Sequence, residues 1–79
     1  MEGYLGQVIF YAGMRIPLNW ALCNGQELEP SQYPALYSII GTLYGGDGVH
    51  TFALPKLTNT EDAALKYIIC CEGEYPQFY

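Results

Sequence analysis

Asp47 and His50 are the acid and histidine that lie closest together in this sequence, and they stand inside a glycine-rich stretch. A carboxylate beside an imidazole is a pairing used in general acid–base catalysis. Gly45, Gly46 and Gly48 surround Asp47, and such a cluster favours a shaped loop with positive φ angles. Because an aspartate side chain readily accepts hydrogen bonds from N–H groups two residues on, we interpret Asp47 as a turn residue and His50 as a polar loop residue.

The three cysteines, Cys23, Cys70 and Cys71, are the other candidates for nucleophilic or metal chemistry. Adjacent cysteines rarely bridge each other, so we expect at most one disulfide and favour three reduced, buried thiols. No basic neighbour is evident to activate Cys70 or Cys71. The chain has one histidine and no Cys-x-x-Cys spacing, which argues against a metal site. We therefore predict no catalytic residue, no cofactor and no metal.

The size and charge of the chain exclude several other functions. Its 79 residues make one small domain, whose core is marginal without a disulfide, a metal or partner subunits. The net charge of −5, with only three cations, argues against nucleic-acid binding. We see no signal peptide and no apolar run that could span a membrane, and therefore expect synthesis in the cytoplasm. Eight tyrosines, three phenylalanines and a tryptophan are more rings than so small a core hides, which indicates contacts between copies of the chain.

The elements that must position these residues predict an α+β fold with short strands, a β-hairpin and one main helix. We expect strands over residues 4–12, 52–54 and 65–71, with the first strand covered by its own core on one face and by a neighbour on the other. Along the last strand, the residues alternate between two faces: Leu65, Tyr67, Ile69 and Cys71 on one, and Lys66, Ile68 and Cys70 on the other. The segment 20–28 predicts a hairpin around Asn24 and Gly25, the favoured central pair of a type I′ turn. Trp20, Phe52 and Leu54 are expected in the core, with Pro55 ending the short strand.

The helix is predicted from Ser31, as its N-terminal cap, to Gly41. An apolar stripe recurs along it at helical spacing. The stripe comprises Tyr33, Leu36, Tyr37 and Ile40. Ile39 lies off this stripe and indicates a second contact. After the helix, residues 58–64 read as a polar connection and residues 72–79 as an aromatic tail that docks somewhere.

Several segments together closely resemble the phage tail collar family, which includes short tail fibres and the bacterial microcystin-dependent proteins. The segments are GQVIFYAG (6–13), WALCNGQ (20–26), ALYS (35–38), IGT (40–42), YGGDG (44–48) and TFALP (51–55). The resemblance covers about residues 1–57. It implies a collar-like fold, a non-enzymatic fibre or tip component, and assembly as a homotrimer. In such a trimer, three copies of His50 meeting on the axis could hold a metal, an alternative we do not favour.

The chain departs from the family pattern in a few places. Asn19 stands where the family usually has glycine, and asparagine is tolerable because it accepts left-handed conformations. Lys56 stands where an aspartate is usual, and the Arg-Gly-Arg that commonly follows is missing. Longer relatives carry a Gly- and His-rich insertion before a final strand, which residues 64–69 resemble here. We therefore interpret residues 1–79 as a minimal collar module without the receptor-probing insertion.

Three functions remain open at this point. The first is an assembly module of a phage tail fibre, tail tip or contractile injection particle, with itself and other tail or baseplate proteins as partners. The second is a small module that binds a cell-surface glycan or protein through Tyr11, Tyr44, Tyr75 and Tyr79. The third is a baseplate or spike adaptor that clamps a neighbouring protein with its tail. The residues expected at an interface or ligand are Tyr11, Ile39, Tyr44, Tyr75, Phe78 and Tyr79.

Overall fold

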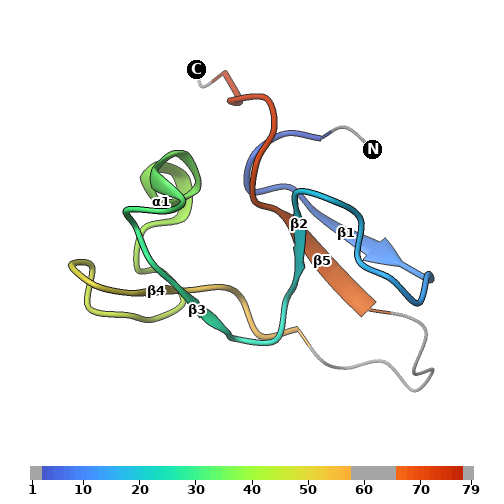
Figure 1. Ribbon diagram of the computed structural model, residues 1–79, viewed down its shortest axis with the longest axis horizontal. Coiled ribbons are helices and arrows are strands. Elements are labelled where there is room, and N and C mark those ends of the chain that lie inside the picture. Colours follow the sequence, from blue (N-terminus) through green and yellow to red (C-terminus); the bar gives the residue numbers. More distant parts are fainter. Residues whose placement is uncertain (1–2, 58–65, 78–79) are drawn as a thin grey trace.

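The computed structural model describes residues 3–57 and 66–77, which form a three-stranded sheet, a two-stranded sheet and one short helix (Figure 1). The elements are β1 (Val8–Tyr11), β2 (Trp20–Leu22), β3 (Glu27–Leu28), α1 (Pro34–Ile40), β4 (Phe52–Ala53) and β5 (Lys66–Cys70). The three-stranded sheet lies on one side of Figure 1, and α1 with the two-stranded sheet lies on the other. This mixture confirms the predicted α+β class.

The last strand, β5, is the centre of the larger sheet, in the order β1-β5-β2. Both of its neighbours run antiparallel to it, with Val8 opposite Ile69 and Trp20 opposite Cys70. The smaller sheet pairs β3 with β4, also antiparallel. The first and last described segments lie side by side in the upper part of Figure 1, where the Leu5 N–H donates to the Glu74 carbonyl at 2.9 Å.

The predicted hairpin around Asn24 and Gly25 is wrong, because β2 pairs with β5 and β3 pairs with β4. Gly25 has a positive φ of 81°, but Asn24 does not, whereas a type I′ turn requires it at both residues. Instead, the Asn24 side chain accepts a hydrogen bond from the Gln26 N–H at 3.0 Å. The Gly25 N–H donates to the Pro55 carbonyl at 3.2 Å. The chain therefore crosses from one sheet to the other at this point.

Helix α1 begins at Pro34, three residues after the predicted Ser31 cap. The N–H groups of Gln32 and Tyr33 both donate to the Glu29 carbonyl, which makes a separate turn ahead of the helix. Pro34 suits the first helical position because its missing N–H would have no helical partner there. The predicted end is confirmed: Gly41, at φ 51°, donates its N–H to the Tyr37 carbonyl at 2.8 Å.

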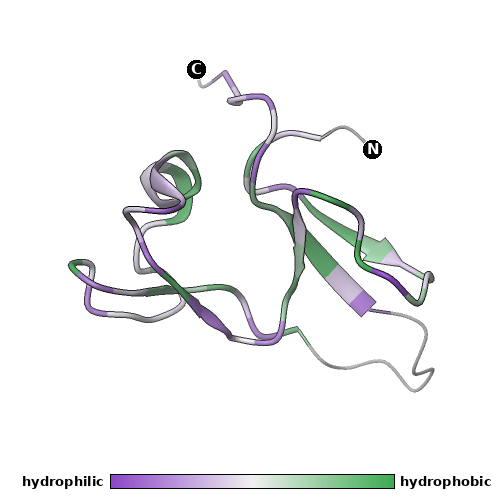
Figure 2. Ribbon diagram, in the orientation of Figure 1, coloured by the Kyte–Doolittle hydropathy of each residue, from purple (hydrophilic) through white to green (hydrophobic). Residues whose placement is uncertain are grey.

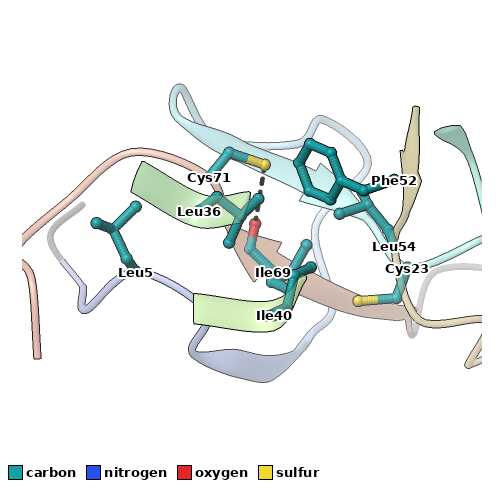
Figure 3. Close-up of a cluster of buried hydrophobic side chains, with 8 residues drawn as sticks. All are labelled: Leu5, Cys23, Leu36, Ile40, Phe52, Leu54, Ile69 and Cys71. Carbon is teal, nitrogen blue, oxygen red and sulfur yellow. Dashed lines mark hydrogen bonds between the residues drawn. The ribbon is translucent and has the colours of Figure 1, made fainter. Parts of the chain in front are cut away.

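The main core lies between α1, β4 and one face of the larger sheet (Figure 3). Its buried members are Leu5, Cys23, Leu36, Ile40, Phe52, Leu54, Ile69 and Cys71. A smaller cluster lies on the other face of the sheet and comprises Trp20, Ile68 and Cys70, with Ile9, Tyr11 and Ile16 packed against them. Successive residues of β5 thus enter opposite clusters, which confirms the predicted alternation, and Figure 2 shows the apolar end of β5 lying between the two halves.

Among the residues that the structure describes, buried clusters cover only one face of strand β1. Ile9 and Tyr11 pack against the smaller cluster. Val8 and Phe10, on the opposite face, stay exposed, although the Phe10 ring stacks on Tyr67 with centroids 4.8 Å apart. The apolar residues that predicted a strand buried on both faces therefore leave one face uncovered within the single chain.

Candidate interaction surface

The glycine-rich segment forms a loop that connects α1 to β4 and is held together by Asp47. One carboxylate oxygen of Asp47, Oδ1, accepts hydrogen bonds from three successive backbone N–H groups, at distances of 2.7–3.0 Å. The donors are Val49, His50 and Thr51. Because these bonds favour the charged form, they hold the pKa of Asp47 well below its ordinary value. The ionised carboxylate of Asp47 therefore stabilises the loop through these hydrogen bonds across the physiological pH range.

Two glycines in this loop occupy conformations that other residues reach only with strain. Gly46 has φ 96°, and a Cβ built on it would lie 2.5 Å from the Cα of Phe52. Gly48 has φ 78°; its N–H donates to the Thr51 carbonyl at 2.9 Å, and its carbonyl accepts from the Tyr37 hydroxyl at 3.1 Å. The loop is thereby packed closely onto β4 and tied to α1.

This braced loop presents apolar side chains to solvent. Leu43 is 78% exposed and Val49 is 73% exposed, with Tyr44 about half exposed between them in the sequence. We call Leu43, Tyr44 and Val49 the loop surface. Exposed large hydrophobic residues gathered on one short segment are typical of a contact site for another protein.

A second group of exposed apolar residues occurs on β1 and on the segment between β1 and β2. Its members are Val8, Phe10, Met14 and Leu18, and we call them the β1-end surface. Sequence reasoning did not single out these residues as interface residues. The signal was present in β1, where four consecutive apolar residues supply more hydrophobic surface than one core can cover.

The loop offers little for catalysis. His50 Nδ1 lies 3.5 Å from the second Asp47 carboxylate oxygen, and both side chains are largely exposed. Because the pKa of Asp47 is strongly lowered, its carboxylate is a poor proton donor or acceptor near neutral pH. Within residues 3–57 and 66–77, no group of three His, Cys, Asp or Glu side chains is placed to hold a metal.

The three cysteines are buried free thiols. Burial raises the pKa of Cys23 and of Cys71 to about 11, and it also raises the pKa of Cys70. A thiol must lose its proton to act as a nucleophile or metal ligand, so these pKa shifts work against both roles. Cys23 and Cys71 belong to the main core, whereas Cys70 belongs to the cluster on the other face of the sheet.

The remaining residues predicted from the sequence are divided between core and surface. Phe52, Leu54 and Pro55 are buried. Trp20 is 7% exposed, and its indole N–H has no hydrogen-bond partner among the described residues. Ile39, off the helical stripe, packs against the main core.

Three of the tyrosines predicted as ligands are described, and they belong to different parts of the structure. Tyr44 lies on the loop surface. Tyr11, the last residue of β1, is half-buried and packs against the smaller cluster. Tyr75 lies near the chain ends, where its hydroxyl is 2.9 Å from the Ser38 hydroxyl. Phe78 and Tyr79 lie outside the described residues, as does the connection at 58–64.

Within the described residues, α1 is far too short to cross a lipid bilayer, and no longer helix occurs.

Two comparisons with known proteins bear on the family of this chain. A search of curated proteins found no match to this chain. A family model, that of the phage tail collar domain, matches residues 6–61.

Proposed function

Since the chain belongs to the phage tail collar domain family, we propose that it assembles as a homotrimer within a phage tail fibre, tail tip or contractile injection particle. The family match supports the structural role in a phage tail fibre. The threefold assembly and the kind of particle are the proposal. Under this proposal, residues 1–79 act as one module without catalytic activity, which is made in the cytoplasm and incorporated into the particle.

The observation that carries the proposal is the amount of apolar surface that the single chain leaves exposed. Val8 and Phe10 lie on the exposed face of β1, and Leu43 and Val49 are exposed on the loop. Seven large hydrophobic residues on two surfaces are unusual for a domain this small, since burying them would add directly to a marginal core. Contacts with identical copies would bury all of them in one assembly.

Native mass spectrometry of the purified chain tests this proposal. We expect a species of three times the chain mass of 8.8 kDa at micromolar concentration. Dilution should convert it to monomer with a loss of secondary structure measured by circular dichroism. A well-folded monomer at micromolar concentration would contradict the proposal.

A second candidate function, recognition of a cell-surface saccharide or protein, is favoured by a groove at the chain ends. The groove has a volume of about 540 Å³ and is lined by Gly3, Tyr4, Gln7 and Glu74. Tyr4 is 54% exposed, and a tyrosine ring beside amide and carboxylate groups suits a sugar ring with its hydroxyls. A glycan array tests this candidate: binding that Tyr4→Ala abolishes would support it, and absence of binding would exclude it for the arrayed sugars.

A further inference from the structure

We propose that the groove at the chain ends selects saccharides that carry a protonated amine over neutral and acidic saccharides. The proposal depends on the saccharide recognition given above as the second candidate function, and it adds the chemical class of sugar that the groove takes. Three features of the described residues support it: an exposed aromatic ring, a carboxylate beside that ring, and no basic side chain around them.

The ring and the carboxylate belong to two segments that pair with each other. Tyr4 and Glu74 form an isolated parallel bridge. The Glu74 N–H donates to the Gly3 carbonyl at 3.1 Å, and the Glu74 carbonyl accepts from the Leu5 N–H at 2.9 Å. Residues paired across a ladder project their side chains to the same face. The Tyr4 ring and the Glu74 carboxylate, both exposed, therefore lie next to each other at the surface.

Two adjoining hollows share these two residues. One has a volume of about 540 Å³ and extends over Gln7, and the other has a volume of about 500 Å³ and extends over Gln77. Volumes of this size are typical of sites for small ligands. A disaccharide can therefore lie along both hollows, with Tyr4 and Glu74 at the point where they join.

The side chain of Gln7 is held in place at the rim of the first hollow. Its Oε1 accepts a hydrogen bond from the Tyr4 N–H at 3.0 Å. Its amide nitrogen carries two hydrogens, which can be donated to the hydroxyl oxygens of a sugar. The Tyr4 ring can pack against the C–H groups of the same sugar. Because the ring and the amide suit any saccharide, only the carboxylate can distinguish saccharides by charge.

The Glu74 carboxylate has no basic side chain to compensate it. The basic side chains of the chain line neither hollow; they are Arg15, Lys56 and Lys66. Among the described residues, Glu74 makes no ion pair with a basic side chain. An ammonium group is attracted both to a carboxylate and to the face of a tyrosine ring. An acidic sugar is instead repelled by Glu74, so the groove favours an amine.

Three disaccharides with the same linkage but different charge test this preference by isothermal titration calorimetry. They are the disaccharides of glucosamine, glucose and glucuronic acid, measured at about pH 6, where an amine is protonated and carboxylates are ionised. We expect the glucosamine disaccharide to bind about three- to fivefold more tightly than the glucose disaccharide, the difference that one exposed charge pair supplies. The glucuronic acid disaccharide should bind most weakly, and high salt should reduce these differences.

Two variants separate the carboxylate in the groove from the overall charge of the chain. Glu74→Gln removes the charge and keeps the shape of the side chain. Glu72→Gln makes the same change in net charge at an exposed residue that lines neither hollow, so it is the matched control. We expect Glu74→Gln to remove the preference for the amine and Glu72→Gln to retain it. Tyr4→Ala should abolish binding of all three disaccharides.

The possible failures are distinguishable. Equal affinity of the wild type for the three disaccharides would overturn the charge preference and leave saccharide recognition standing. A preference that survives Tyr4→Ala, or that both glutamate variants lower equally, would overturn the assignment to this groove, because the net charge of −5 would then explain it. Absence of binding for all three would overturn both the preference and saccharide recognition for these sugars.

Discussion

Replacing Leu43 with alanine should separate assembly from folding more sharply than any core substitution. The side chain is 78% exposed in the isolated chain, so it contributes little to the folded monomer. A surface substitution of this kind changes the free energy of unfolding by no more than about 0.5 kcal/mol. The same side chain belongs to the loop surface, which the proposed homotrimer would bury, so its removal affects every subunit.

The expected effect follows from the area that remains to be buried. Leucine carries three more carbon groups than alanine, each worth about 0.8 kcal/mol when buried. With 78% of the residue still exposed, association would gain about 1–2 kcal/mol per copy from them, or about 3–6 kcal/mol for three contacts. Since about 1.4 kcal/mol is a factor of ten, the trimerisation constant should fall by roughly two to four powers of ten.

Sedimentation equilibrium over a dilution series measures this constant, and urea unfolding followed by circular dichroism measures folding. Tyr4→Ala is the matched control, because Tyr4 is also exposed but belongs to neither surface. We expect Leu43→Ala to dissociate at higher concentrations than the wild type and Tyr4→Ala to behave as the wild type does. An unchanged constant for Leu43→Ala would refute the reasoning that this side chain is buried on assembly.

Three further predictions concern the fold itself. Replacing Leu36, which is fully buried on the core face of α1, with alanine should lower the free energy of unfolding by about 2–5 kcal/mol, measured by urea titration. Asp47→Ala should speed amide hydrogen exchange at residues 49–51 relative to the wild type, because three N–H groups lose their acceptor; unchanged exchange would contradict the bracing role. Burial raises the pKa of Cys23 and Cys71 from 9.0 to about 11, so the folded state holds these protons longer than the unfolded state does. The contribution of these thiols to stability should therefore be constant below pH 9 and fall as the pH rises from 9 to 11, and a flat profile over pH 9–11 in thermal melts would contradict this.

Local patterns in the sequence predicted the elements that depend on neighbouring residues. The alternation in the last strand and the stripe that contains Leu36 and Ile40 gave the correct buried faces. Asn19 takes the positive φ of 71° expected where the family has glycine. These features follow from side-chain periodicity and backbone sterics, which act within a few residues.

Pairing between distant strands could not be predicted in the same way. Asn24 and Gly25 match a type I′ turn locally, yet the tertiary contacts of β2 with β5 and of β3 with β4 outweigh that preference. The glycine loop was identified from its composition, but its exposed Leu43 and Val49 were not, because exposure depends on what the rest of the chain covers.

The central position of β5 has a consequence for how the chain is made. Both strands that flank it are synthesised first, and neither pairs with the other. A nascent chain that has emerged from the ribosome as far as β4 therefore holds two unsatisfied strand edges and half of its core. The sheet closes only when β5 has been synthesised, and its closure must bring together segments that are distant in the sequence, which is intrinsically slow. During that interval the apolar β1 is open to wrong partners, and shielding by a chaperone or by rapid encounter with sister chains would decide the yield of correctly assembled particles.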